Sequence, residues 1–195
     1  MDTTKVFKEQ LKQLDILSDA DVNLIRSYFT PQKLKQNEFF LKTGERCSKL
    51  GFLESGIMRT FVYDLEGEEV VKYFIDENIL FTDIECYENS TLAKLNIQAI
   101  TDCQILIITK RDNELLQSQL PQWDSIQKQF ATTALAKMIN KQNFLRIGSA
   151  VDQYKYFTEH FPNLAQNVPL KHIASYLGIT QSSLSRLRKE WIKNS

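Results

Sequence analysis

The residues whose chemistry is easiest to interpret lie near the end of the chain. Between Thr180 and Lys189, amide, hydroxyl and cationic side chains alternate with leucines, and no acidic residue interrupts them. Gln can pair with adenine and Arg with guanine, while hydroxyls and cations suit phosphates. These residue types therefore suit contact with double-stranded DNA. The candidate contact residues are Gln181, Ser182, Ser185, Arg186, Arg188 and Lys189, with Lys171 upstream.

Such side chains read DNA only when a rigid element presents them, and the segment 170–189 predicts one. Ala174 is small, so a second helix can cross the first closely. Gly178 allows the left-handed backbone that ends the first helix, and Thr180 is a good N-cap for the next. The pattern predicts a helix-turn-helix, with a plain helical hairpin as the alternative. The apolar positions expected to face inward are Ile173, Leu177, Leu184 and Leu187.

The charges of the chain are unevenly distributed. Lys and Arg together number 24, as do Asp and Glu, so the formal net charge is zero. Residues 54–88 nevertheless contain ten acidic residues against Arg59 and Lys72, whereas residues 165–195 carry a net charge of +4. A basic terminal segment suits a polyanion such as nucleic acid, and an ordinary solvated helix face is the alternative.

The middle of the chain predicts a small all-β unit. Short runs of β-branched and aromatic residues between Leu34 and Thr109 are separated by turn signals, and Asp64 to Gly67 reads as a hairpin turn. Two short amphipathic helices, Thr4–Leu14 and Asp19–Phe29, precede this unit, and a sandwich, jelly roll or barrel fits it. The expected strands are Glu38–Leu41, Gly51–Leu53, Ile57–Tyr63, Val70–Ile75, Leu95–Ile100 and Cys103–Thr109.

A long helix is expected after Pro121. Its apolar stripe is wider than one neighbour covers, which predicts a second surface such as a symmetry mate in a homodimer. A helix buried wholly within one chain is the alternative. The residues expected at the dimer interface are Trp123, Ile126, Phe130, Ala134 and Met138, and the stripe is widened by Ala131, Leu135, Ile139 and Leu145.

Composition argues against several other classes of protein. The 195 residues are 43% hydrophobic, yet no apolar run approaches the length of a membrane span, and no signal peptide is recognised. Three cysteines without CxxC spacing favour free thiols in a reducing, cytoplasmic compartment. A cupin-like metalloenzyme would need imidazoles inside the barrel, but the only histidines, His160 and His172, lie outside it. No catalytic residue, cofactor or metal site is therefore expected.

The whole chain resembles the Crp/Fnr family of transcriptional regulators. The resemblance is carried by the glycine turns at 43–45, 53–56 and 64–69, and more specifically by Ile173 to Ile179 followed by Ser183 to Arg186. It implies an α+β protein: a double-stranded β-helix (jelly roll) of the cyclic-nucleotide-binding type over residues 1–120, a dimerisation helix over 121–148, and a helix-turn-helix (winged-helix-like) domain over 149–195.

The resemblance also implies partners and roles. Such proteins bind inverted-repeat operators as homodimers, and Gln181, Ser182 and Arg186 fall where the family reads base edges. RNA polymerase and an unidentified small-molecule effector are further partners that the family allows. A ligand-sensing module that does not bind DNA is the alternative function.

The sequence departs from the cyclic-AMP-responsive pattern in the presumed effector pocket. Phe81 and Thr82 stand where those members have a Gly-Glu pair, no arginine occurs between residues 59 and 111, and Lys94 is the candidate substitute. We therefore expect no cyclic-AMP binding, and a pocket filled by Phe81, Ile84 and Tyr87 rather than by another ligand.

The three cysteines are also too few for the oxygen-sensing pattern of the family. None precedes Cys47, so no iron–sulfur cluster is expected. Cys86 and Cys103 remain as a candidate redox switch or as small buried apolar residues.

Overall fold

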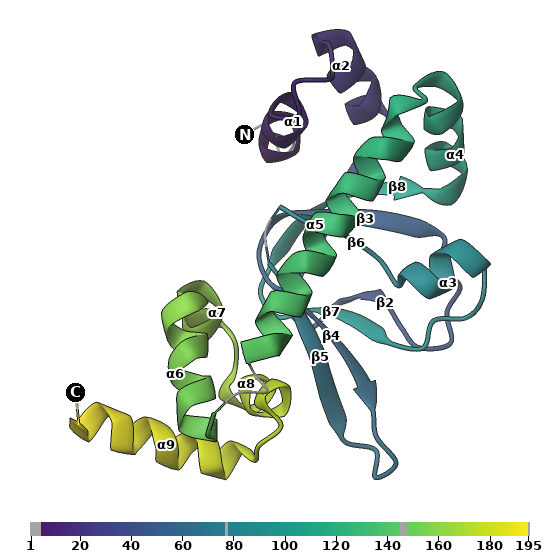
Figure 1. Ribbon diagram of the computed structural model, residues 1–195. Helices are drawn as coiled ribbons and strands as arrows, with labels where there is room; N and C mark the ends of the chain where they lie inside the picture. Colours follow the sequence, from purple (N-terminus) through teal and green to yellow (C-terminus); the bar gives the residue numbers. More distant parts are fainter. Residues whose placement is uncertain (1–4, 77, 145–147, 195) are drawn as a thin grey trace.

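The computed structural model describes residues 5–76, 78–144 and 148–194. A β-roll forms the middle of the molecule, with the N-terminal helices at one end and the C-terminal helices at the other, and a long helix, α5, runs between them (Figure 1). The fold is therefore α+β, as expected from the order of strand-like and helix-like segments.

Two four-stranded antiparallel sheets build the β-roll. Their strand orders are β1-β8-β3-β6 and β2-β7-β4-β5, and the apolar side chains between them form a buried core. The strands are β1 (Thr30–Leu34), β2 (Phe39–Leu41), β3 (Lys49–Ser55), β4 (Met58–Tyr63), β5 (Glu69–Ile75), β6 (Leu80–Phe81), β7 (Asn96–Ala99) and β8 (Cys103–Thr109).

All six expected strands are present, and the sequence analysis missed β1 and β6. β1 contains Pro31, which argues against a strand in the sequence, but β1 is an edge strand paired only with β8, where a missing N–H is tolerated. β6 is only two residues long and pairs with β3 at Gly51 and Phe52, so it carries no periodic signal.

The N-terminal helices pack on the outside of the β-roll. They are α1 (Lys5–Lys12) and α2 (Asp19–Ser27), and Ser18 and Asp21 form a capping box at the start of α2. Together with α4 (Lys110–Gln119), they enclose a core that includes Phe52 of β3 and the start of α5 (Gln122–Phe144).

The prediction that Trp123 and Ile126 lie at a dimer interface is wrong. Both side chains have 0% exposure within their own chain, because they pack among α1, α2 and α4. The indole nitrogen of Trp123 also donates a 2.8 Å hydrogen bond to Asn113 Oδ1 of α4. The stripe of α5 thus begins as an intrachain core rather than as an exposed surface.

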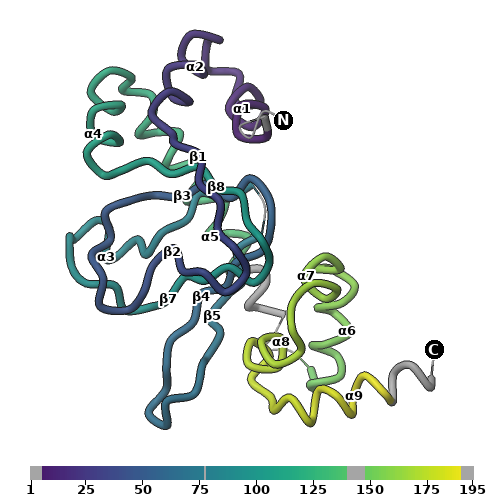
Figure 2. Tube along the Cα trace, turned by 180° about the vertical axis from the view of Figure 1, so that it is seen from behind, coloured from purple at the N-terminus to yellow at the C-terminus, as the bar shows by residue number. Residues whose placement is uncertain are grey.

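Four helices follow in the C-terminal part: α6 (Ala150–His160), α7 (Pro162–Asn167), α8 (Leu170–Leu177) and α9 (Gln181–Asn194). They share one apolar core with the sheet β2-β7-β4-β5. Phe61 and Phe74 contribute from the sheet, and Phe157 and Ile173 contribute from the helices. Figures 1 and 2 both place α8 beside β4 and β5.

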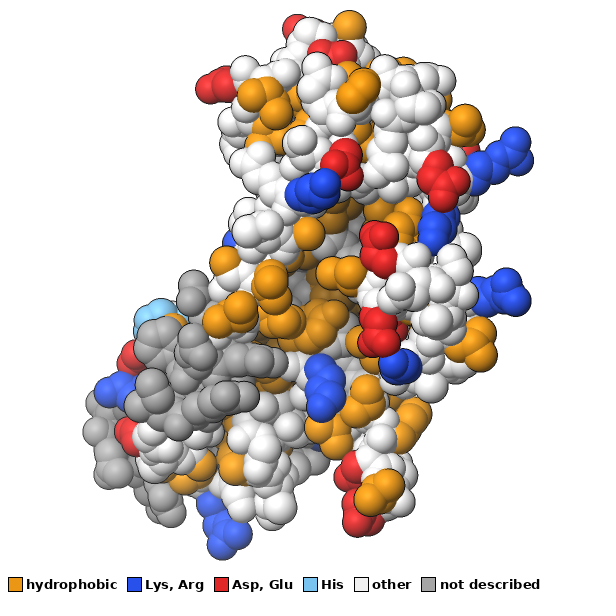
Figure 3. Space-filling model, turned by 45° about the vertical axis from the view of Figure 1, so that its right-hand side comes forward, with side chains coloured by type: hydrophobic (Ala, Val, Ile, Leu, Met, Phe, Trp, Pro, Cys, Tyr) orange, Lys and Arg blue, Asp and Glu red, His pale blue; other side chains and the backbone are white. Residues whose placement is uncertain are grey.

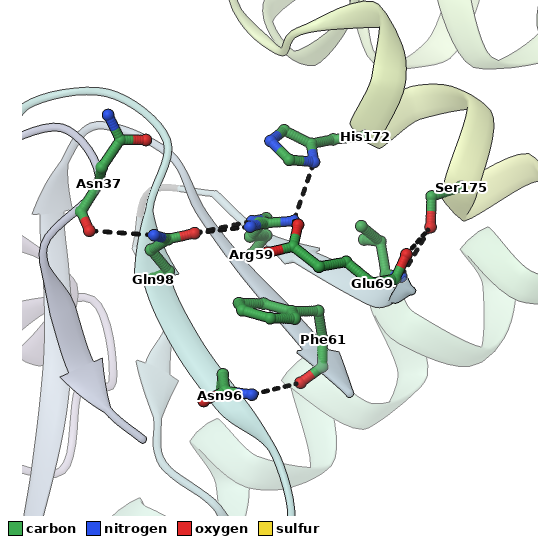
Figure 4. A network of polar contacts seen from close by, with 9 residues as sticks. Asn37, Arg59, Phe61, Glu69, Asn96, Gln98, His172 and Ser175 are labelled. Carbon is green, nitrogen blue, oxygen red and sulfur yellow. Dashed lines mark hydrogen bonds and ion pairs between the residues drawn. The ribbon is translucent and has the colours of Figure 1, made fainter. Parts of the chain in front are cut away.

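Backbone groups of β5 anchor α8 through Ser175. The amide of Val71 donates to Ser175 Oγ at 3.0 Å, and the Ser175 hydroxyl donates to the carbonyl oxygen of Glu69 at 2.8 Å (Figure 4). A helix therefore caps polar groups of this strand, which lies at the edge of its sheet.

Arg59 of β4 contributes polar contacts to the same junction between the sheet and α8. Arg59 is 3% exposed, and its guanidinium donates to Gln98 Oε1 of β7 and to Glu69 Oε2. The same guanidinium lies 2.8 Å from His172 Nδ1 of α8 (Figure 4). Since Arg is a donor only, His172 must accept this bond through an unprotonated Nδ1. We refer to Arg59, Glu69, Gln98 and His172 as the docking network.

The docking network requires the neutral form of His172. Burial, followed by the charges of Arg59 and Lys171, lowers the pKa of His172 to about 4, against a smaller opposite effect of Glu69. The hydrogen bond from Arg59 in turn lowers the pKa of Glu69. The network therefore pairs one cation with one carboxylate and a neutral imidazole.

We expect acidification to weaken the fold through His172. The pKa of this histidine is near 6.5 in the unfolded chain and about 4 in the folded chain. Between these pH values the unfolded chain therefore binds a proton that the folded chain does not. The free energy of unfolding should therefore fall by about 2 kcal/mol between pH 7 and pH 5 on account of this group. Urea unfolding at both pH values measures the loss.

His172→Gln should remove that part of the pH dependence, because an amide oxygen can still accept from Arg59 but does not titrate. His160→Gln is the matched control, since His160 is exposed on α6. An unchanged pH dependence in His172→Gln would contradict the role of the docking network.

Candidate nucleic-acid interface

The turn between α8 and α9 has the geometry expected from its sequence. Gly178 has φ = +70°, the left-handed conformation, and its amide donates to carbonyl oxygens of α8. The amide of Ile179 donates to the Ala174 carbonyl at 3.0 Å, which closes the turn tightly. Thr180 Oγ1 then accepts from the Ser183 amide at 3.1 Å and caps α9, as predicted.

Apolar residues on the inner faces fix the two helices relative to each other. Ile173, Ala174, Leu177 and Leu184 are buried in the core shared with the β-roll. Because these residues pack in one core with the sheet, α8 rigidly supports α9 and its outer face. The helix-turn-helix geometry predicted over residues 170–189 is present.

The structure brings the predicted contact residues together on the outside of α9. The side chains of Gln181, Ser182, Arg186, Arg188 and Lys189 are exposed, Ser185 is half-buried, and Lys171 is exposed at the start of α8. Helical spacing places Gln181, Ser185 and Lys189 on one line and Ser182 and Arg186 on the next. We call the six α9 residues, Gln181, Ser182, Ser185, Arg186, Arg188 and Lys189, the α9 face.

The α9 face carries three cations, Arg186, Arg188 and Lys189, that are exposed. Among the ion pairs within the described part of the chain, none involves Arg186, Arg188 or Lys189. Cations beside amides and hydroxyls can neutralise phosphates while the neighbouring groups reach base edges. Whether these particular residues contact DNA stays a prediction.

Sequence reasoning missed the docking network that orients this face. The sequence places His172 only on the first helix of the pair, outside the β unit, whereas in the structure its side chain is buried against Arg59. One signal was available in the sequence. Residues 54–88 contain ten acidic residues and two basic residues, and Arg59 is one of the two. The partners of Arg59 lie 10, 39 and 113 residues away along the chain, so no local pattern could identify them.

The presumed effector pocket is filled by the chain itself. Phe81 is buried against Phe40, and a Cβ on Gly51 would lie 2.5 Å from Phe81 Cζ, so the ring occupies the space that this glycine leaves. Tyr87 is also buried. The expectation that Ile84 fills the pocket is wrong, because Ile84 is 63% exposed at the start of α3 (Ile84–Asn89).

The other two pocket residues are engaged elsewhere. Thr82 donates its hydroxyl proton to the Lys49 carbonyl at 3.1 Å. Lys94 is exposed and forms an ion pair with Glu85, which raises the pKa of Lys94. A lysine held by a carboxylate is a poor anchor for a phosphate. The assignment of an effector pocket to Phe81, Thr82 and Lys94 stays a prediction.

The part of α5 beyond Ile126 leaves apolar side chains uncovered. Phe130, Ala134 and Met138 are half-buried, whereas Leu135 and Ile139 are 51% and 45% exposed. Figure 3 shows apolar side chains gathered at the middle of one face of the molecule. Leu145, which widens the predicted stripe, lies outside the described residues.

Within the described residues, no helix combines the length and apolar character that a membrane span requires. The same residues contain no cluster of three or more His, Cys, Asp or Glu side chains that could hold a metal ion. Residues 148–194 are helices and their connections, so no wing strands occur in that described range.

Comparison with known proteins addresses the β-roll first. Residues 31–119 match the model of the cyclic nucleotide-binding domain family. A search of curated proteins finds no significant match.

Solved structures resemble the chain over most of its length. FixK2 from Bradyrhizobium japonicum has a TM-score of 0.71 at 16% identity, with 85% of each chain covered. The global regulator CLP from Xanthomonas campestris, described as responsive to c-di-GMP, has a TM-score of 0.71 at 12% identity, covering 91% of this chain and 93% of that chain. A protein from Eubacterium rectale described as a regulator of the Crp/Fnr family has a TM-score of 0.70 at 17% identity, covering 93% and 86%.

Each of these likenesses covers at least 85% of the chain and therefore extends beyond the β-roll. At such identities they concern the fold. Residues 31–119 thus match the cyclic nucleotide-binding domain family, and the chain as a whole has the fold seen in the Crp/Fnr transcriptional regulators.

Proposed function

We propose that this protein is a sequence-specific DNA-binding transcriptional regulator of the Crp/Fnr type that binds inverted-repeat operators as a homodimer. The observation that carries the proposal is the α9 face, an exposed row of amide, hydroxyl and cationic groups on the second helix of a tightly turned helix pair. A mainly basic surface on such a helix is the electrostatic footprint of DNA binding.

The roles of individual residues follow from their positions on α9. Gln181 and Ser182 lie in the first turn, where a recognition helix meets base edges, and Arg186 lies one turn further along the same side. Arg188 and Lys189 sit deeper along the helix and, with Lys171 of α8, suit contacts to phosphates. We therefore assign base recognition to Gln181, Ser182 and Arg186, and electrostatic attachment to the remaining cations.

A second copy is proposed to cover α5. Leu135 and Ile139 are four residues apart on one helix face and stay exposed after the chain has buried its own core. Two chains paired along α5 would present two α9 faces, which must span successive major grooves about 34–36 Å apart. The half-buried Phe130, Ala134 and Met138 border this seam.

The filled β-roll supports a regulator that takes no cyclic nucleotide inside it. Phe81 occupies the interior, and the one cation proposed for a phosphate, Lys94, is paired with Glu85. We therefore propose neither a cofactor nor an enzymatic activity.

Selection from a pool of random duplexes by the full-length chain tests the function. A two-fold symmetric consensus is the expected result. Failure to retain any duplex at low ionic strength would favour the alternative, a sensor module that does not bind DNA.

Arg186→Ala should weaken binding to the selected duplex by about 1–3 kcal/mol, the usual value of one paired contact with a base. Binding to unrelated duplexes should change much less. Fluorescence anisotropy titrations on both duplexes measure the difference, and Arg111→Ala, an exposed arginine of α4, is the matched control. Equal weakening on both duplexes would reassign Arg186 to a phosphate.

Lys189→Ala should weaken binding on all sequences alike and should reduce the slope of log affinity against log salt concentration by about 1, because one phosphate contact is lost. Titrations between low and moderate salt give the slope. If the slope matches that of the unmodified chain, Lys189 lies outside the interface.

Leu135→Glu combined with Ile139→Glu should convert dimers into monomers, because two buried carboxylates would face each other across the seam. Both positions are exposed within one chain, so the fold should survive, which circular dichroism checks. Leu115→Glu is the control, since Leu115 is 44% exposed on α4. Dimers of the double variant in sedimentation velocity would place the interface elsewhere.

A further inference from the structure

A cavity of about 250 Å³, the α1–α5 cavity, lies where α5 leaves the core of its own chain. Three segments that are distant in the sequence line it: the end of α1, the connection between β5 and β6, and the middle of α5. None of the described residues in the core between the two sheets lines it, so it is separate from the interior of the β-roll. The polar side chains that line it are Gln10, Gln13, Asn78, Gln129, Thr133 and Lys137.

The α1–α5 cavity and the proposed seam between two copies lie on different sides of α5. Thr133 and Lys137 line the cavity and follow the buried Ile126 at whole turns of the helix, so they lie on the side that faces their own chain. The helical repeat places the exposed Leu135 and Ile139 on the opposite side. A molecule in the cavity therefore does not compete with a second copy for the same surface.

Asn78 brings an unsatisfied acceptor to the α1–α5 cavity. Its backbone has φ = +69°, and its amide donates to the Leu53 carbonyl of β3 at 2.9 Å, which fixes the connection on the sheet. Its side-chain Oδ1 is buried, yet no group of the described residues donates to it. A buried acceptor without a donor costs free energy, and rotation of this side-chain amide toward a bound N–H group would relieve that cost. The cavity therefore favours a ligand that carries a hydrogen-bond donor.

The other lining groups set the charge and the size of such a ligand. Lys137 is the only charged side chain among the described residues that line the cavity, and it forms no ion pair with another described residue. It suits one anionic group, such as a carboxylate. The amides of Gln10, Gln13 and Gln129 can both donate and accept, so they suit neutral or zwitterionic groups. The volume lies below that of pockets for drug-sized molecules, so the ligand is small.

We propose that the α1–α5 cavity binds a free amino acid with an uncharged side chain. The carboxylate of the amino acid lies against Lys137, and its ammonium group donates to side-chain amide oxygens, including Asn78 Oδ1. Its side chain packs on Leu14 and Phe130, which supply the apolar part of the lining. A molecule held in this way contacts α1 and α5 together and fastens the N-terminal helix to the long helix. The inference concerns binding by this chain alone and does not depend on DNA binding.

Titration calorimetry on the full-length chain tests the proposal. The probes are the standard amino acids with uncharged side chains, each titrated separately, and at least one of them should bind saturably at a single site per chain. Sodium acetate carries only the carboxylate and methylamine carries only the ammonium group. Both should bind much more weakly than that amino acid, because each satisfies only one part of the lining.

Variants then locate the site. Lys137→Met should weaken binding of that amino acid about tenfold or more, because a charge-assisted hydrogen bond is lost. Asn78→Gly should also weaken binding, since glycine tolerates φ = +69° but lacks the acceptor. Thr133→Phe should abolish binding by filling the cavity; Thr133 is exposed, so the fold should survive, which circular dichroism checks. Lys128→Met is the matched control, because Lys128 lies on the same helix but pairs with Asp124.

Absence of saturable binding by every one of these amino acids would overturn the proposal. Undiminished affinity in Thr133→Phe or in Lys137→Met would do the same, because the site would then lie elsewhere. Acetate that binds as tightly as the amino acid would contradict the role of the donor group. DNA binding is measured separately, so failure of the regulator function and failure of this site give different results.

Discussion

The arrangement of the molecule depends on one apolar surface that the sheet β2-β7-β4-β5 and the C-terminal helices bury between them. Phe61 and Phe74 on the sheet pack in the same core as Phe157 and Ile173 of the helices. Burial of each such side chain is worth about 1.5–3 kcal/mol. Because this surface closes within a single chain, the forces that fold the protein also orient the α9 face.

Apolar burial alone does not fix how α8 is oriented on the sheet, and the polar contacts at the edge of the apolar surface do. Arg59 would be costly to bury alone, but Gln98, Glu69 and His172 satisfy its donors in one relative position of α8 and the sheet. Ser175 adds two bonds to the backbone of β5. The docking network therefore selects one orientation of the helix pair among those that apolar contact alone would allow.

Close packing also explains why the interior of the β-roll is filled. Gly51 leaves room for the ring of Phe81, and with that ring in place the roll is packed as a core rather than hollowed as a pocket. A roll of this kind holds α5 in place on one side and the C-terminal helices on the other.

The sequence by itself determined the local structure. The alternating runs between Leu34 and Thr109 identify the strands, and Gly178 with Thr180 identifies the turn of the helix pair, because backbone conformation and capping depend on neighbours within a few residues. The α9 face follows from the same periodicity, since residues on the outside of a helix recur at fixed spacing.

Only the tertiary structure decided which apolar residues meet within one chain. The stripe from Trp123 to Met138 looks uniform in the sequence, yet its first two members are covered by α1, α2 and α4, while Leu135 and Ile139 are left exposed. Likewise, Arg59 and His172 are 113 residues apart in the sequence yet lie in contact. Periodicity reports that a side chain is apolar or polar on a given face, whereas its partner is set by how distant segments pack.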